Sequence, residues 1–329
     1  MKPARLLTTF ALILVLAAAG AGGVYLWFLN VVAAPGPLQA PVTMIIAPGT
    51  GVAAIGRQLA AAGVVEKPWL PALAARRSGQ DRTLKPGEYR FDPGISVTAI
   101  LDKLARHDVV ARFVTIPEGL VTADILSILD AAEGLTGAVA SQIAQGDLLP
   151  ETYRYEWGDR REDVIAHMRT ARDAAAKELW DARAADLPLT TPEEAMVLAS
   201  IVEKETGKTG ERARVAGVFI NRLRRGMKLQ SDPTVIYGLA RIGERDGALT
   251  IANLELPTPY NTYVIPGLPP APICHPGRAA LAAALNPAVS QDLYFVADGS
   301  GGHAFAATLE AHNQNVARWR QIQRQNNLH

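Results

Sequence analysis

The sequence predicts an α+β protein with a single N-terminal transmembrane helix, a small α+β module and a larger, mainly helical α+β domain. Three observations carry this prediction. Residues 6–28 form a long apolar run, a strand–turn–helix pattern recurs between residues 42 and 129, and most of the periodicity from residue 161 onward is helical. Strand patterns separated from longer helical patterns are typical of the α+β class.

The first element is an uncharged run of 23 residues, 6–28, rich in Leu, Ala and Val. At about 1.5 Å per residue, a helix of this length crosses a hydrocarbon core of roughly 30 Å. Tyr25 and Trp27 near its far end suit the aromatic belt of a membrane interface. A cleaved signal peptide is the alternative, although the run is long for the apolar region of one.

The charges around this run predict its orientation. Lys2 and Arg5 precede it, and the next charged residue is Arg57. The positive-inside rule therefore places residues 1–5 in the cytoplasm and the bulk of the chain across the membrane. The Pro-, Gly- and Ala-rich residues 29–41 predict a short linker.

The small module, residues 42–115, is predicted from a weak repeat. Residues 46–49 and 91–94 both end in Pro-Gly and are followed by apolar residues at the same offsets, and a looser copy begins at residue 116. Each copy predicts a strand, a turn and a short amphipathic helix, with chance recurrence of Pro-Gly as the alternative. The larger domain, residues 116–329, follows, with a buried strand expected at 292–297 and helices at 161–183, 211–225, 231–237 and 309–326.

Composition excludes several classes of protein. The chain is 49% hydrophobic and 20% charged with a formal charge of +1, which argues against an electrostatic nucleic-acid binder. The single cysteine, Cys274, cannot form an internal disulfide, and the six histidines lack zinc-hydrolase spacing. No phosphate-binding Gly-rich motif and no Gly-x-Ser-x-Gly motif is present. We therefore expect neither a metal nor a cofactor.

One predicted helix carries a carboxylate on its apolar face. Thr191 suits the N-cap of this helix, Pro192 suits its first position, and Gly207 follows its end. Glu205 extends an apolar stripe formed by Leu198, Ile201 and Val202. Burial and the negative end of the helix dipole both raise a carboxyl pKa, and a carboxyl that stays protonated near neutral pH can act as a general acid. The plain alternative is a helix-end Glu with no chemical role.

Polar and aromatic side chains gather in the loops that follow this helix. Amides, hydroxyls and tyrosine rings suit a neutral carbohydrate, although turn chemistry explains any one of these loops equally well. Asp232 in particular is also explained as a helix cap. We expect the following candidates to line one cleft with Glu205: Gln230, Asp232, Thr234, Tyr237, Tyr260, Asn261, Tyr263 and His303.

Several blocks in the same order resemble the YceG-like family of endolytic murein transglycosylases. The matching blocks are residues 84–91, 199–206, 218–223, 229–237, 260–263, 267–270, 294–298 and 301–303. The catalytic glutamate of the family falls on the second Glu of Glu203-Lys204-Glu205. Residues 148–153 depart from the family pattern, and Cys274-His275 lies at a variable position, so neither segment is assigned a role.

The resemblance implies a single-pass inner-membrane protein with a LysM-like module and a periplasmic catalytic domain. It also implies a lyase that cleaves the β-1,4 bond between N-acetylmuramic acid and N-acetylglucosamine inside glycan strands, leaving 1,6-anhydro-muramyl ends. Glu205 would serve first as acid and then as base. One alternative is a lysozyme-type hydrolase with Asp232 as second carboxylate, and another is a non-catalytic, membrane-anchored scaffold that binds peptidoglycan.

The expected partners follow from the same reading. They are peptidoglycan glycan strands, the lipid bilayer through residues 6–28, and membrane-bound penicillin-binding synthases, with no role for nucleic acid. A short linker after the anchor keeps the active site near the membrane, because an extended chain spans at most about 3.5 Å per residue. The expected substrate is therefore nascent glycan.

Overall fold

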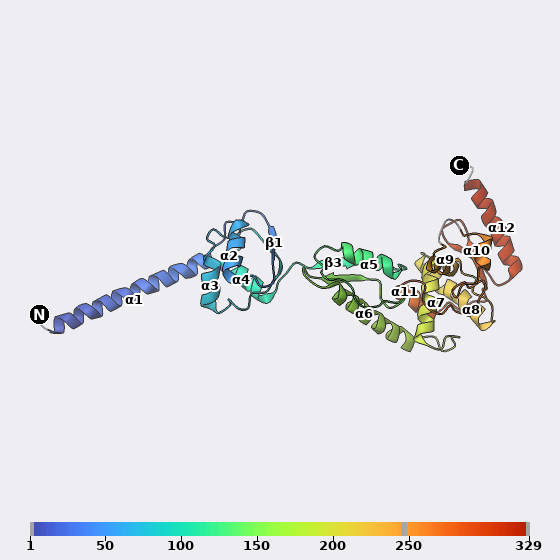
Figure 1. Ribbon diagram of the computed structural model, residues 1–329, viewed down its shortest axis with the longest axis horizontal. Coiled ribbons are helices and arrows are strands. Elements are labelled where there is room, and N and C mark those ends of the chain that lie inside the picture. Colours follow the sequence, from blue (N-terminus) through green and yellow to red (C-terminus); the bar gives the residue numbers. More distant parts are fainter. Residues whose placement is uncertain (1–2, 245–248, 327–329) are drawn as a thin grey trace. The chain divides into compact units, whose positions relative to one another are not determined.

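The computed structural model describes residues 3–244 and 249–326. The chain mixes helices with three two-stranded sheets and divides into two compact units (Figure 1). Unit 1 comprises residues 3–112 with 156–158, and unit 2 comprises residues 113–155 with 159–326. Each unit has its own hydrophobic core and is described by itself.

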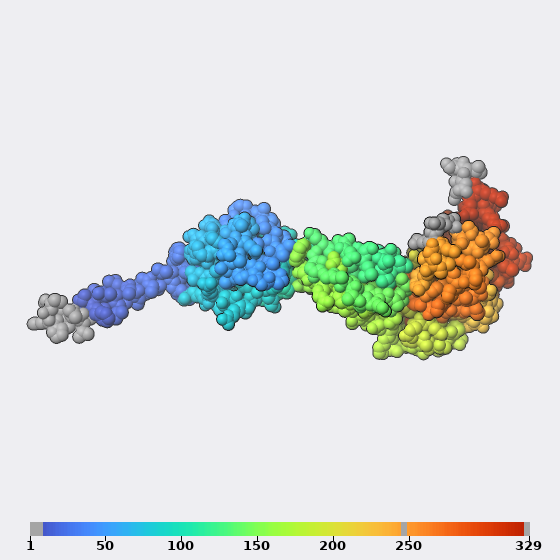
Figure 2. Space-filling model, viewed as in Figure 1, coloured from blue at the N-terminus to red at the C-terminus, as the bar shows by residue number. Residues whose placement is uncertain are grey.

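Unit 1 begins with the long helix α1, Pro3–Ala33. Residues 9–33 of α1 are long and apolar enough to cross a membrane, and Figure 2 shows this helix as a narrow rod projecting from unit 1. The helix continues five residues past the expected end of the span at residue 28. Val32 is buried against α4, and its carbonyl accepts a hydrogen bond of 3.1 Å from the Thr98 hydroxyl.

The segment after α1 packs against unit 1, although its composition predicts a linker. Leu38 is 7% exposed and belongs to the core of unit 1. The Gly94 N–H donates to the Leu38 carbonyl at 3.0 Å, and the Gly36 N–H donates to the Gly94 carbonyl at 3.2 Å. Because Gly36 and Leu38 are both held, packed chain joins α1 to the rest of unit 1.

The rest of unit 1 runs β1 (Val42–Ile46), α2 (Val52–Ala61), α3 (Leu70–Ser78), β2 (Gly87–Phe91) and α4 (Val97–Arg106). Strands β1 and β2 pair antiparallel, with Val42 opposite Phe91. The first two repeat copies are strand–turn–helix segments as predicted, with Gly49 and Gly94 at positive φ in the turns. Helix α3 was not predicted.

The third repeat copy belongs to unit 2. Strand β3 (Arg112–Thr115) leads to α5 (Thr122–Ala131) and pairs with β4 (Thr152–Tyr155), and α6 (Arg161–Asp181) follows. The apolar side of this small sheet packs with α5 and α6 around Ile125, Leu129 and Ile165. The pairing of β3 with a later strand, rather than with β1 or β2, explains why this copy leaves the first module.

The remainder of unit 2 is mainly helical and surrounds α7 (Pro192–Glu205), which packs against α6, α8, α9 and α11. The other elements are η1 (Thr209–Glu211), α8 (Arg212–Arg224), α9 (Asp232–Arg241), α10 (Ile251–Glu255), α11 (Arg278–Leu285), β5 (Tyr294–Ala297), β6 (His303–Ala306) and α12 (Leu309–Asn326).

Three expectations for this region change. Residues 195–202 of α7 are buried all round, so α7 is a central helix and not an amphipathic surface helix. Helix α9 does not end at Gly238 but continues to Arg241. Gly238 allows a close approach of Thr258, where a Cβ would clash, and does not act as a helix stop. Strand β5 is half-buried where a buried strand was expected, and it pairs with β6 in a two-stranded hairpin.

Candidate active site

Glu205 is the last residue of α7, where the helix leaves the core. The Thr191 hydroxyl caps the other end by accepting from the Glu194 N–H at 3.2 Å, as predicted. The Glu205 side chain meets the loop before α9, where the Ser231 hydroxyl donates a hydrogen bond to Glu205 Oε1. Ser231 is 1% exposed, so this partner is itself held inside the protein.

The burial of Glu205 and the groups around it determine the pKa of its carboxyl group. Burial raises the pKa of Glu205 to about 7, and the nearby charge of Asp232 acts in the same direction. The Ser231 hydrogen bond and the charges of His303 and Arg222 act the other way but are smaller together. The prediction that burial raises this pKa is confirmed, and the group holds its proton over much of the range below pH 7.

Glu203, the other glutamate of the triplet, has a different environment. Its side chain is 6% exposed and lies 3.3 Å from the Arg212 guanidinium, and it accepts the Gly277 N–H at 3.0 Å. Arg212 also contacts Glu118 at 3.2 Å. Glu203 therefore ties three segments of unit 2 together. In the described ranges no Lys or Arg lies within ion-pair distance of Glu205, so the two glutamates differ in their charge partners.

Arg222 on α8 organises the loop that delivers Ser231. Its guanidinium donates to the carbonyl of Leu229 at 2.7 Å and to that of Leu293 at 2.6 Å, and the side chain is buried. It also lies 3.4 Å from the Gln230 amide oxygen.

Sequence reasoning assigned no role to Arg222, and it considered Ser231 only as one of two candidate caps, with Asp232, for the helix that begins there. The signal for Arg222 was its spacing, because it follows the buried Val218 by four residues and Phe219 by three and so lies on the apolar side of α8.

Asp232 and Tyr263 form a second polar pair beside Glu205. The Tyr263 hydroxyl donates to Asp232 Oδ1 at 2.6 Å, and burial raises the pKa of Tyr263 with Asp232 and Glu205 adding to the effect. Ser231 takes the N-cap position of α9, so Asp232 is left exposed in the first turn. Gln230 precedes it at φ 52°, a left-handed conformation that turns the loop, and its side chain is exposed.

His303 reaches the site from the start of β6. Its Nδ1 lies 2.7 Å from Glu211 Oε2, and its backbone N–H donates to the other oxygen of Glu211 at 3.2 Å. Although burial opposes it, these hydrogen bonds hold the pKa of Glu211 below its usual range. The Phe295 ring packs edge-on against His303 at 5.2 Å. Glu211 thus orients His303, which is one of the groups that lower the pKa of Glu205.

The remaining four predicted ligands form two pairs with different surroundings. Tyr237 and Tyr260 pack edge-to-face at 4.8 Å beside Arg241, farther along α9, and both are partly exposed. Thr234 and Asn261 are 0% exposed. Their expected contact with substrate is corrected here, because their polar atoms are used inside the protein.

Both buried residues brace the site. The Thr234 hydroxyl donates to the Ser231 carbonyl at 2.6 Å and lies 2.8 Å from the Thr262 hydroxyl, which accepts the Ser231 N–H at 2.9 Å. The Asn261 amide donates to the carbonyls of Leu254 and Leu256 at 3.0 and 2.8 Å. Thr234 therefore holds the loop that carries Ser231, and Asn261 holds the end of α10.

The segments without an assigned role contribute side chains that make contacts inside the protein. His275 is fully buried between the Thr122 hydroxyl and the Leu148 N–H, and burial lowers its pKa to about 4. Cys274 is buried against the Ser200 carbonyl, and burial raises its pKa to about 12. Within residues 148–153, the Tyr153 hydroxyl donates to the Leu149 carbonyl at 2.6 Å.

Comparisons with known proteins agree with this arrangement of blocks. The model of the YceG-like family matches residues 44–318. An endolytic murein transglycosylase of Streptococcus pneumoniae (strain D39) is 29% identical over 322 residues, covering 84% of this chain and 58% of that relative. One of Bacillus subtilis is 34% identical over 171 residues, covering 52% of this chain and 46% of the relative. The chain thus spans about half the length of these relatives.

A crystal structure of a YceG-like protein from Listeria monocytogenes also matches. It is 29% identical, with a TM-score of 0.48, and the match covers 84% of this chain and 99% of that one. The family match covers unit 1 from residue 44 onward and nearly all of unit 2, and it includes the end of α7 and the loop before α9. The chain belongs to the YceG-like family.

Proposed function

We propose that this protein is an endolytic peptidoglycan lytic transglycosylase, a lyase that cleaves the MurNAc-β-1,4-GlcNAc bond within glycan strands. The observation that carries the proposal is the Glu205 carboxyl, held by Ser231 with a pKa raised to about 7 while Glu203 is tied to Arg212. The names of the relatives, endolytic murein transglycosylases, point to the same substrate.

The proposed reaction uses one carboxyl group twice. Protonated Glu205 donates its proton to the glycosidic oxygen as the bond from that oxygen to C1 of the muramic sugar breaks. The 6-hydroxyl of the same sugar then attacks C1, and the Glu205 carboxylate takes the hydroxyl proton. Atoms and charge balance without water, the product is a 1,6-anhydro end, and Glu205 is returned to its protonated form.

A second candidate function is that of a muramidase, and the position of Asp232 supports it. Asp232 is exposed, and its charge is one of the causes that raise the pKa of Glu205, so it lies on the same side of the site. A hydrolase uses such a carboxylate as nucleophile or as base for water. Against this role, Asp232 Oδ1 already accepts a hydrogen bond from the Tyr263 hydroxyl, which orients the carboxylate toward Tyr263.

Digestion of purified glycan strands with mass analysis of the products tests both candidates. We expect anhydro ends from the parent enzyme, no cleavage by Glu205→Gln, and retained cleavage by Asp232→Asn. Products with reducing ends, one water heavier than anhydro ends, would indicate a hydrolase if Asp232→Asn no longer forms them. Binding of strands without any cleavage would leave only the scaffold alternative.

The location of the activity is also a proposal. We infer a single-pass anchor in the inner membrane, with the N-terminus cytoplasmic and both units periplasmic, supported by the apolar 9–33 helix. The β1–α2–α3–β2 order with antiparallel β1 and β2 supports a LysM-like module in unit 1. An enzyme anchored in this way acts on nascent glycan beside penicillin-binding synthases. Comparing glycan chain lengths in cells with anchored and released enzyme tests this.

A further inference from the structure

Helix α3 of unit 1 presents an aromatic and basic stripe to solvent. Trp69, the N-cap of α3, and Leu73 are 47% and 46% exposed, and Arg76 and Arg77 follow at helical spacing. The opposite side of α3 is buried in the core of unit 1. The exposed apolar side chains of Trp69 and Leu73 are therefore not needed to pack α3 against that core. An exposed Trp and Leu beside arginines on a short helix therefore indicate a surface made for contact.

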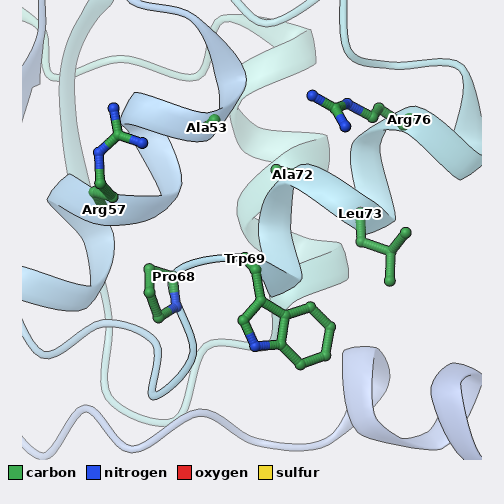
Figure 3. A pocket seen from close by; sticks show the side chains of 7 residues that line it. All are labelled: Ala53, Arg57, Pro68, Trp69, Ala72, Leu73 and Arg76. Carbon is green, nitrogen blue, oxygen red and sulfur yellow. The ribbon is translucent and has the colours of Figure 1, made fainter.

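A pocket of about 500 Å³ lies between this stripe and α2 (Figure 3). Arg57 from α2 and Arg76 from α3 flank it, with Pro68 and the Trp69 ring below them in that view. Neither arginine forms an ion pair in the described part of the chain. Residues 52–79 carry four basic side chains and one acidic side chain, so the face is cationic.

The same stripe continues onto α1. A second pocket, of about 560 Å³, is lined by Trp69, Leu73 and Arg77 on one side and by residues from Gly20 to Phe28 of α1 on the other. The Arg77 guanidinium stacks on the Tyr25 ring at 4.3 Å. The contact surface of α3 and the last turns of the apolar helix are therefore continuous.

Helix length places this junction at the level of the lipid headgroups. Arg5 limits the apolar run at its start, and 20 residues counted from Leu6 end at Tyr25. At about 1.5 Å per residue they span the roughly 30 Å of hydrocarbon. Tyr25 and the residues just after it then lie in the interfacial layer, and α3 lies beside them. Aromatic rings and arginines are the side chains that this layer favours.

We propose that the α2–α3 face of unit 1 docks on the anionic phospholipid surface of the leaflet from which α1 emerges. Trp69 and Leu73 insert among the headgroups, and Arg57 and Arg76 bind lipid phosphates. The proposal rests on the proposed membrane anchor and adds a second contact to it. Docking fixes the orientation of unit 1 on the membrane. The packed segment after α1 then connects the membrane anchor to a module that itself contacts the lipid surface.

Environment-sensitive labels on the full-length protein in lipid nanodiscs test the proposal. Cys274 is buried, so single cysteines introduced at Leu73, Leu14 or Ile45 can be labelled selectively. Leu14 on α1 reports insertion of the anchor, and Ile45 on β1 is a matched exposed position of unit 1 outside the stripe. We expect brominated lipids to quench labels at Leu73 and Leu14, and iodide in water to quench the label at Ile45.

The charge requirement is measured on the Leu73 label. In nanodiscs with one quarter phosphatidylglycerol, Arg57→Gln with Arg76→Gln should lower the ratio of lipid-docked to water-exposed label roughly 30-fold, since each basic group near an anionic surface contributes about 5-fold. Arg90→Gln with Arg106→Gln, which removes two exposed charges elsewhere in unit 1, should leave the ratio unchanged.

Each other outcome overturns the proposal. If Leu14 is lipid-exposed while the Leu73 label is as open to iodide as the Ile45 label, the anchor stands and docking fails. If Leu14 is also water-exposed, the anchor fails as well. Protection of Leu73 from iodide by soluble glycan fragments, without quenching by lipid, would make the pocket a sugar site. An equal ratio of lipid-docked to water-exposed label in the two double variants would show that Arg57 and Arg76 do not contribute to docking.

Discussion

Replacing Glu205 by Gln should change the pH dependence of stability as well as abolish cleavage. The carboxyl ionises near 4.5 in the unfolded chain and near 7 in the folded one. Between these values the folded state binds more protons, so the free energy of unfolding falls as pH rises through this range. Each pKa unit corresponds to about 1.4 kcal/mol, so the ionised group lowers stability by about 3 kcal/mol above pH 7.

Gln keeps the shape of the side chain but cannot ionise. We therefore expect Glu205→Gln to gain about 3 kcal/mol over the parent protein between about pH 4.5 and pH 8. Denaturant unfolding of full-length protein in detergent, followed by tryptophan fluorescence across this range, measures the gap. A gap that does not change with pH would refute the assignment of a buried, protonated carboxyl to Glu205.

Glu203→Gln is the matched control, because it makes the same chemical change two residues earlier on α7. It removes one of the two carboxylate partners of Arg212 and weakens the acceptor for the Gly277 N–H. Arg212 keeps its contact with Glu118, so the loss is that of hydrogen bonds to a charged group, and we expect destabilisation of about 2 kcal/mol near neutral pH. The two variants should therefore differ in sign above pH 7, and a gain in stability from Glu203→Gln would contradict its structural role.

Three further outcomes follow from the site. Ser231→Ala removes a hydrogen bond that lowers the Glu205 pKa. The alkaline limb of the pH–rate profile is expected near pH 7 in the parent enzyme and should move to higher pH in this variant. A limb that stays in place or moves to lower pH would contradict this. Arg222→Gln leaves the carbonyls of Leu229 and Leu293 without their buried donor, so unfolding should be easier by about 3 kcal/mol; an unchanged denaturation midpoint would exclude this bracing. Thr191→Ala removes the cap of α7, lowering the melting temperature by an amount equivalent to about 1 kcal/mol with no change in the pH profile.

Local signals in the sequence determined the elements around the site. Thr191 and Pro192 mark the start of α7, and the terminal helix begins and ends at the predicted residues, 309 and 326. The spacing of apolar residues also placed Glu205 in line with the buried Leu198, Ile201 and Val202. These features depend on the periodicity of a helix and on the hydrogen-bonding needs of its first turn, which are properties of neighbouring residues.

The tertiary structure alone decided which side chains meet Glu205. Ser231 lies 26 positions later in the chain and reaches Glu205 only because Arg222 and Thr234 hold its loop in place. The same loop chemistry predicted Asn261 as a ligand, yet its amide is turned inward to cap α10. Amide and hydroxyl groups bind substrate or backbone equally well, so their role is set by burial and long-range packing, which spacing along the chain does not encode.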